Sequence, residues 1–130
     1  MKSRLTLVAL LILGFTSTQL NALDFKEGNW VVSFDTEVIA FNMHLPTITQ
    51  EQCLTKENAI PQPEQQDACQ TSKLKTVGST ITWSLTCPDS HGNGKVIYKG
   101  KTFTSSMNMI SASGEMKMKI KGTYKGPCNK

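Results

Sequence analysis

Four cysteines follow a hydrophobic N-terminal segment, and these two features together constrain the fold more than any other part of the sequence. Two basic residues precede an apolar run over residues 5–15, and a polar stretch then ends in a small residue at Ala22. This order is typical of a secretory signal peptide. The apolar run has 11 residues, whereas a membrane-spanning helix needs about 20. We therefore expect cleavage of residues 1–22 and a mature periplasmic domain over residues 23–130 that is not integral to a membrane.

The four cysteines are expected to form two disulfides, because an exported chain folds in an oxidising compartment. The sequence between Cys69 and Cys87 is typical of a hairpin that turns near Gly78, and each of these cysteines lies nine residues from that glycine. Opposed residues of a hairpin lie close enough at Cβ for a disulfide. Cys53 and Cys128 then pair by elimination. The sequence has no C-x-x-C pair and no Cys/His cluster at zinc spacing, which favours a structural role for the cysteines.

Apolar and polar residues alternate with a period of two through much of the mature sequence. In residues 80–87, for example, Ile81, Trp83 and Leu85 share one face, and threonines and a serine occupy the other. One-sided alternation of this kind is typical of an antiparallel sheet with one solvated face. The segments that show it are residues 29–40, 80–87, 95–99, 102–110 and 115–125.

Two segments break the alternation. Residues 41–52 contain Pro46 and little pattern, so a loop or a broken strand is expected there. Residues 53–61 carry the signals of a short helix, with Thr55 as its N-cap and Pro61 at its end. The sequence therefore predicts one all-β domain: an antiparallel meander of about five or six strands that forms an open barrel or sandwich, with one short helix and two disulfides.

Charge is distributed unevenly along the mature chain. Residues 23–90 contain 4 Lys and 9 Asp or Glu, whereas residues 91–130 contain 8 Lys and 1 Glu. An acidic or lipid-headgroup partner would suit the basic half, but pairing of the two halves within one domain is the simpler interpretation. Residues 23–130 contain no arginine. This argues against nucleic acid as a partner, because arginine commonly makes bidentate contacts with bases.

Several short motifs resemble one known family in their order and spacing. They are Gly28-Asn-Trp30, Cys53-Leu-Thr55, Cys69, Ser79-Thr-Ile-Thr-Trp83 running to Cys87, Gly92-Asn-Gly94 before a strand with Tyr98, and Gly126-Pro-Cys128 after a methionine-rich hairpin. The pattern is similar to that of a bacterial exported family catalogued as the domain of unknown function numbered 3617, over essentially the whole mature chain. The resemblance implies a small periplasmic β domain and supplies no catalytic residues.

Four methionines form the most suggestive cluster for a site. If the last two strands form a hairpin, Met107 faces Met118 and Met109 faces Met116 on one face of the sheet. Thioether sulfurs select Cu(I), and His44 is a further candidate ligand. The same methionines would also suit an irregular core, or a pliable apolar groove for a lipid or peptide. The aromatic and aliphatic residues that share their face favour the core.

The sequence contains no nucleophile elbow, no His-Glu-x-x-His motif and no phosphate-binding loop. We therefore expect a small periplasmic protein that is not an enzyme, needs no cofactor, and acts as a binding or interaction module. The sequence does not specify its partner, and an apolar small molecule, a lipid or a peptide is the expected class. The alternative is a periplasmic Cu(I)-binding protein that uses the methionine cluster.

Overall fold

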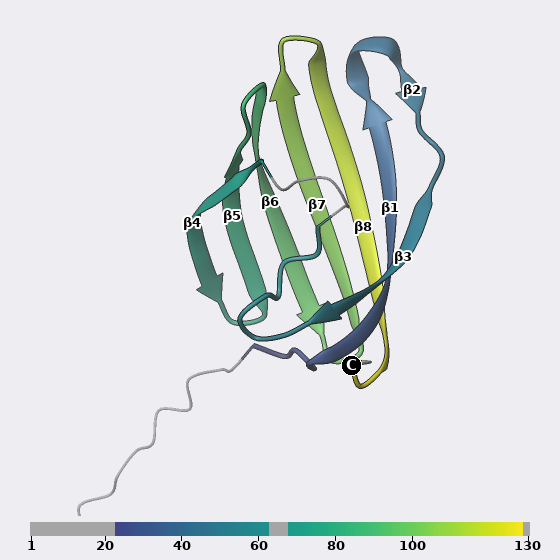
Figure 1. Cartoon of the computed structure of the whole chain (residues 1–130), viewed down its shortest axis with the longest axis vertical. Helices are drawn as coiled ribbons and strands as arrows, with labels where there is room; N and C mark the ends of the chain where they lie inside the picture. Colours follow the sequence, from purple (N-terminus) through teal and green to yellow (C-terminus); the bar gives the residue numbers. More distant parts are fainter. Residues whose placement is uncertain (1–22, 63–67, 129–130) are drawn as a thin grey trace, which may run out of the picture.

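The computed structural model describes residues 23–62 and 68–128, and in this part of the chain eight strands and one 3₁₀ turn are found (Figure 1). They are β1 (Gly28–Val38), η1 (Ile39–Phe41), β2 (Met43–His44), β3 (Ile48–Leu54), β4 (Gln70–Val77), β5 (Thr80–Thr86), β6 (Ser90–Lys99), β7 (Thr102–Ser111) and β8 (Gly114–Gly126). The all-β expectation is confirmed, but the expected number of strands was too low. The signal peptide expected at residues 1–22 lies outside the described residues.

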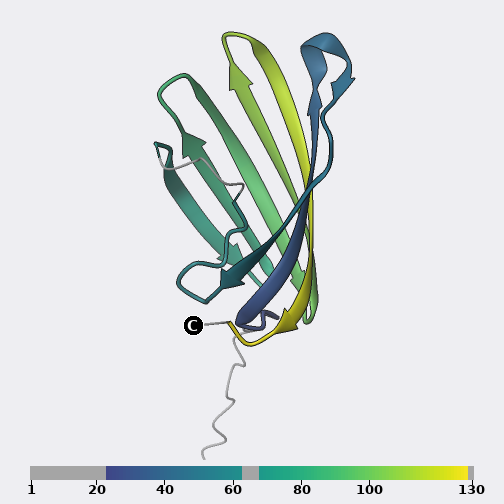
Figure 2. The same ribbon diagram turned by 45° about the vertical axis from the view of Figure 1, so that its right-hand side comes forward.

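The strands pair antiparallel in one sheet, in the order β2-β1-β8-β7-β6-β5-β4. Strands β4 to β8 form the expected meander, whereas β1 comes from the other end of the chain to pair with β8. Strands β2 and β3 both pair with the remaining side of β1, on either side of a break around Pro46. The sheet is therefore open, with β3 at one edge and β4 at the other, and Figure 2 shows its curl.

Alternation gives the sheet an apolar face and a polar face, which we call the inner and outer faces. On β1, Trp30, Val32 and Phe34 point to the inner face and are at most 2% exposed. On β8, Ile120 is buried between the exposed residues Lys119 and Lys121. The lysines of the C-terminal half thus lie on the outer face, where they are solvated.

Two glycines make room for aromatic rings on the inner face. A Cβ atom added at Gly122 would lie 1.9 Å from the Phe103 ring, and one added at Gly94 would lie 2.3 Å from the Trp83 ring. These contacts show that each ring lies flat over a strand residue that has no side chain. Glycine is therefore required at both positions by packing.

The core is built around Trp30, which is fully buried. Its ring centroid lies 5.4 Å from that of Phe103, 5.7 Å from that of Tyr124 and 5.9 Å from that of Tyr98. Its indole N–H donates a hydrogen bond to the carbonyl oxygen of Lys26, at 2.9 Å. Aromatic pairs at these separations add to the stabilisation that their buried area provides.

Residues 55–62 lie against the inner face and cover part of the core. They begin with a tight turn in which the Asn58 N–H donates to the Thr55 carbonyl oxygen at 3.0 Å and to Thr55 Oγ1 at 3.2 Å. This turn replaces the short helix expected after Cys53, so that prediction was wrong. Farther along, the Ala59 carbonyl accepts a hydrogen bond from the Tyr98 hydroxyl, and Pro61 is fully buried.

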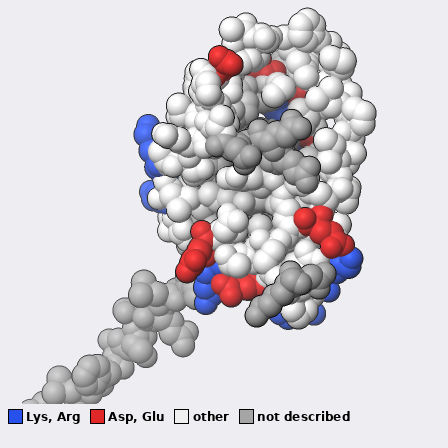
Figure 3. All heavy atoms as spheres, in the orientation of Figure 1, with Lys and Arg blue, Asp and Glu red and all other residues white. Residues whose placement is uncertain are grey.

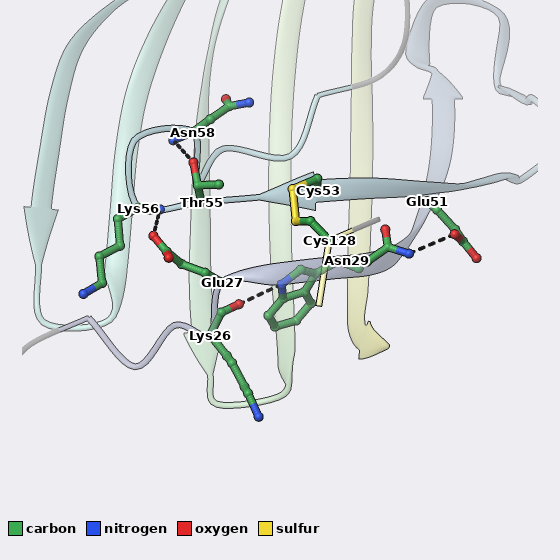
Figure 4. Close-up of a disulfide and its surroundings, with 10 residues drawn as sticks. Lys26, Glu27, Asn29, Glu51, Cys53, Thr55, Lys56, Asn58 and Cys128 are labelled. Atoms are coloured by element: carbon green, nitrogen blue, oxygen red, sulfur yellow. Dashed lines mark hydrogen bonds between the residues drawn. A yellow bond between two sulfur atoms is a disulfide. The ribbon is translucent and has the colours of Figure 1, made fainter. Parts of the chain in front are cut away.

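The disulfides join Cys53 to Cys128 and Cys69 to Cys87, which is the pairing expected from the sequence. The first connects the edge strand β3 to the segment after β8, with the two Cα atoms 5.4 Å apart (Figure 4). The second connects the segment before β4 to the end of β5. Each bond therefore secures one edge of the sheet to a neighbouring part of the chain.

Polar contacts surround the Cys53–Cys128 disulfide. Glu51 accepts a hydrogen bond at 2.9 Å from the Asn29 side chain (Figure 4) and a second one from Lys125. The hydrogen bond from Lys125 has the largest effect in lowering the pKa of Glu51, and the hydrogen bond from Asn29 lowers it further. Glu27 accepts a hydrogen bond at 2.8 Å from the backbone N–H of Lys56. The contacts tie β1, β3, β8 and the 55–62 segment together.

Within residues 23–62 and 68–128, no helix is long and apolar enough to cross a membrane.

Candidate functional site

Exposed apolar side chains gather at one end of the sheet, where the β1–β2 connection and the β7–β8 hairpin lie side by side (Figures 1 and 2). The two turns approach closely, because a Cβ atom added at Gly114 would lie 2.8 Å from the Ala40 Cβ. Phe41 is the most exposed, at 69%. We call this group of residues the apolar end, and it consists of Ile39, Phe41, Met43, Leu45 and Met116.

A row of apolar side chains leads from the apolar end into the core along the inner face. Met43 is opposite Val38, Val38 is also opposite Met116, and Met116 is opposite Met109. Exposure falls from 47% at Met43 and 38% at Met116 to 8% at Met109. The apolar end is thus the solvent-facing part of a continuous apolar strip.

On the molecular face shown in Figure 3, most of the charged side chains lie near the margins, and uncharged residues make up much of the area between them that is not drawn in grey. Burial raises the pKa of Tyr98 well above its ordinary value. Its hydroxyl donates a hydrogen bond to the Ala59 carbonyl beneath the 55–62 segment. Tyr98 is therefore part of the hydrophobic core on the inner face.

The four methionines considered as Cu(I) ligands have the expected register, with Met107 opposite Met118 and Met109 opposite Met116. Met107 and Met109 are only 4% and 8% exposed and belong to the hydrophobic core. Their side chains therefore serve packing, which is the alternative that the sequence favoured.

His44 does not join these methionines. It is opposite Glu37 on the outer face, with its Nε2 3.9 Å from Glu37 Oε1, and most of its side chain is exposed. In the described part of the chain, no three His, Cys, Asp or Glu side chains are grouped so that they could hold a metal ion.

The oppositely charged halves of the chain meet at strands β1 and β8. Glu37 is opposite Lys117 and Asp35 is opposite Lys119 on the outer face. This arrangement agrees with the interpretation that the two halves pair within one domain.

The outer face also has a groove that the sequence did not reveal. It crosses β5, β6, β7 and β8, has a volume of about 590 Å³, and is lined by serine, threonine and asparagine side chains and by Lys73, Lys95, Lys117 and Lys119. The excess of lysine in the C-terminal half was its only sequence signal, because the groove depends on the register of four strands.

These features define a small disulfide-linked domain made of one open antiparallel sheet. A family model described as "Protein of unknown function (DUF3617)" matches residues 25–128, and the chain belongs to this family. The match confirms the resemblance that the sequence motifs indicated. No curated protein and no solved structure matches the chain.

Proposed function

We propose that this protein is a non-enzymatic periplasmic binding module that holds an acyl chain at its apolar end. The observation that carries the proposal is the continuous strip from exposed Met43 and Met116 to buried Met109. Contiguous exposed apolar surface on a soluble domain marks a site of interaction. Methionine suits such a site because its unbranched side chain adapts to ligands of varied shape.

The chemistry of the apolar end supports binding rather than catalysis. Its five side chains contain no nucleophile, no general base and no charged group. Removal of apolar surface from water provides about 25 cal/mol per Å², so affinity would come from the length of the acyl chain in contact. The periplasmic location rests on the N-terminal segment and on the two disulfides, which persist in oxidising compartments.

A fluorescent fatty acid tests the proposal. Parinaric acid is titrated into the oxidised protein comprising residues 23–130, and a double variant carries Met43→Gln and Met116→Gln. We expect the double variant to bind at least about tenfold more weakly, because it places two amides against the acyl chain.

The control variant carries Leu74→Gln and Val77→Gln, which change two apolar residues of β4 that are 62% and 63% exposed. Its affinity for parinaric acid should stay within about twofold of that of the original protein. Non-specific adsorption to exposed apolar residues would instead be weakened by both pairs of substitutions. Absence of binding, or equal loss in both variants, contradicts the proposal. Displacement of the probe by an apolar peptide but not by unlabelled fatty acid would identify a peptide site instead.

The alternative function is Cu(I) binding by the methionine cluster. It is favoured by the register that sets Met107 against Met118 and Met109 against Met116, and it is disfavoured by the burial of Met107 and Met109. A titration that distinguishes the two functions is described in the Discussion.

A further inference from the structure

The outer groove is organised by two neighbouring rows of side chains that cross the sheet. In one row Asn93 of β6 is opposite Asn108 of β7, and Asn108 is opposite Lys117 of β8. In the next row, Lys95 is opposite Ser106. The groove has a volume of about 590 Å³, which lies within the usual range for small-molecule sites.

The groove is basic. Lys73, Lys95, Lys117 and Lys119 line it, and the residues that line it include no aspartate or glutamate. Within the described residues, no carboxylate oxygen lies within 4.0 Å of these four ammonium groups, although Glu37 and Asp35 of β1 are opposite Lys117 and Lys119. Four such lysines around one groove attract an anionic ligand.

One hydrogen-bond acceptor among the residues that line the groove has no donor. The Oδ1 atom of Asn108 is buried and accepts no hydrogen bond from the described residues. A buried amide oxygen without a donor costs free energy. A ligand hydroxyl that contacts Asn108 would supply that donor, whereas a fully ionised phosphate or carboxylate would not.

We propose that this groove binds an acidic oligosaccharide, in which carboxylates contact the lysines and sugar hydroxyls contact Asn93 and Asn108. The site is separate from the apolar end, which lies on the inner face and at the tips of two hairpins. The residues that line the groove also disfavour two other classes of anion. They include no arginine for bidentate phosphate contacts. Their one aromatic residue, Trp83, is only 3% exposed and belongs to the core, so it offers no ring on which a nucleic acid base would stack.

The experiment is isothermal titration calorimetry of the oxidised protein comprising residues 23–130 with three polymers. Oligogalacturonate is an acidic saccharide, dextran is a neutral saccharide, and polyphosphate is an anion that has no sugar hydroxyl groups. We expect oligogalacturonate to bind and dextran not to bind. Polyphosphate should bind more weakly than oligogalacturonate when polymers with the same number of charges are compared.

Three variants locate the site. The pair Lys95→Gln and Lys117→Gln should weaken oligogalacturonate binding at least about tenfold, because charge-assisted hydrogen bonds are strong. Asn108→Ala should weaken the binding of oligogalacturonate but not that of polyphosphate. The control pair Lys99→Gln and Lys101→Gln removes the same charge outside the groove and should change the affinity by less than about twofold, because exposed charges at a distance are screened by salt.

Several outcomes would overturn the proposal. Equal loss from the control pair would show that net charge alone attracts the polymer. Polyphosphate that binds as tightly as oligogalacturonate, or an Asn108→Ala variant that weakens both, would remove the argument for a saccharide. Absence of any oligogalacturonate binding at physiological salt would reject the site. Each variant is first shown by circular dichroism to retain the fold.

Discussion

Cys69 lies opposite Cys87 because one extra residue in β4 changes the register of the β4–β5 hairpin. Next to the turn Val77 is paired with Thr80, and this register, continued to the start of β4, would place Cys69 opposite Pro88. A bulge within β4 shifts the register by one position. The two cysteines then meet, with their Cα atoms 4.2 Å apart.

The first prediction concerns this bulge, in which Lys73 and Leu74 lie opposite Trp83. Lys73→Val should disfavour the bulge, because a β-branched side chain rarely adopts the positive φ of this position, so that oxidative refolding forms the Cys69–Cys87 disulfide less efficiently. Non-reducing peptide mapping measures the yield. Lys73→Gly is the control, because Lys73 has a φ of 51° that glycine adopts without strain, and it should keep the disulfide. Full disulfide yield in Lys73→Val would show that the bulge does not set the pairing.

The second prediction compares the two disulfides. They close loops of very different length, since Cys53 and Cys128 are 75 residues apart and Cys69 and Cys87 are 18 apart. Chain entropy gives stabilisations of about 4.5 and about 3 kcal/mol. Replacing Cys53 and Cys128 by serine should therefore lower the free energy of unfolding by about 1 kcal/mol more than replacing the other pair. Urea unfolding measures both, and the reverse order would show that native-state contacts outweigh loop length.

The third prediction concerns packing at Gly122. Gly122→Ala should lower the free energy of unfolding by about 1–3 kcal/mol, because the added methyl group overlaps the Phe103 ring. Gly126→Ala is the matched control on the same strand, since no atom lies within 4 Å of the added Cβ there. In a double-mutant cycle with Phe103→Leu, the cost of Gly122→Ala should shrink. Equal costs at Gly122 and Gly126 would contradict the packing argument.

The fourth prediction concerns the buried hydroxyl of Tyr98. Burial raises the pKa of Tyr98 above its ordinary value of 10.0, so above pH 10 the unfolded chain loses a proton that the folded chain keeps. The contribution of Tyr98 to stability is therefore complete below pH 10 and decreases as the pH rises above it. Tyr98→Phe should cost about 1–3 kcal/mol near neutral pH, because the Ala59 carbonyl loses its donor.

Urea unfolding at about pH 8 and about pH 11 tests this prediction. The stability of the original protein should fall more between the two conditions than that of Tyr98→Phe, whose other titrating groups are the same. Equal pH dependence in the two proteins would show that the Tyr98 hydroxyl is not protected by burial.

The fifth prediction separates the core role of the methionines from copper binding. Met107→Leu combined with Met118→Leu nearly conserves volume and should cost less than about 1.5 kcal/mol for each substitution. Titration of the protein with Cu(I) against a competing chelator should then give the same result before and after substitution. Tight Cu(I) binding that the double variant loses would instead establish the methionines as a metal site.

Alternation predicted the strands whose two faces differ most. Ile81, Trp83 and Leu85 are at most 5% exposed, and the threonines and serine between them point the other way. Strand β3 has no such contrast, because it lies at an edge and Ile48 remains 61% exposed. Its pattern was therefore too weak to distinguish a loop from a broken strand.

The short helix after Cys53 was predicted from signals that are correct locally. Thr55 does accept a hydrogen bond from a backbone N–H, as an N-cap would, but the donor is Asn58 in a tight turn. The segment is held by contacts with residues distant in sequence, such as the hydrogen bond that the Ala59 carbonyl accepts from Tyr98, 39 residues away. Local sequence contains no trace of such a contact. The outer groove was missed for the same reason, since it exists only when four strands are in register.

The two edges of this open sheet have a consequence for how copies of the protein meet. Edge strands present unpaired backbone groups that template the addition of a strand from another molecule. Here Pro46 separates β2 from β3, and β3 is linked to Cys128 through Cys53. Strand β4 carries a bulge that contains Lys73 and is followed by Lys75. Charge, proline and bulges are the devices that blunt such edges. These features therefore oppose the addition of a strand from another copy at either edge, although hydrophobic side chains are exposed at one end of the sheet.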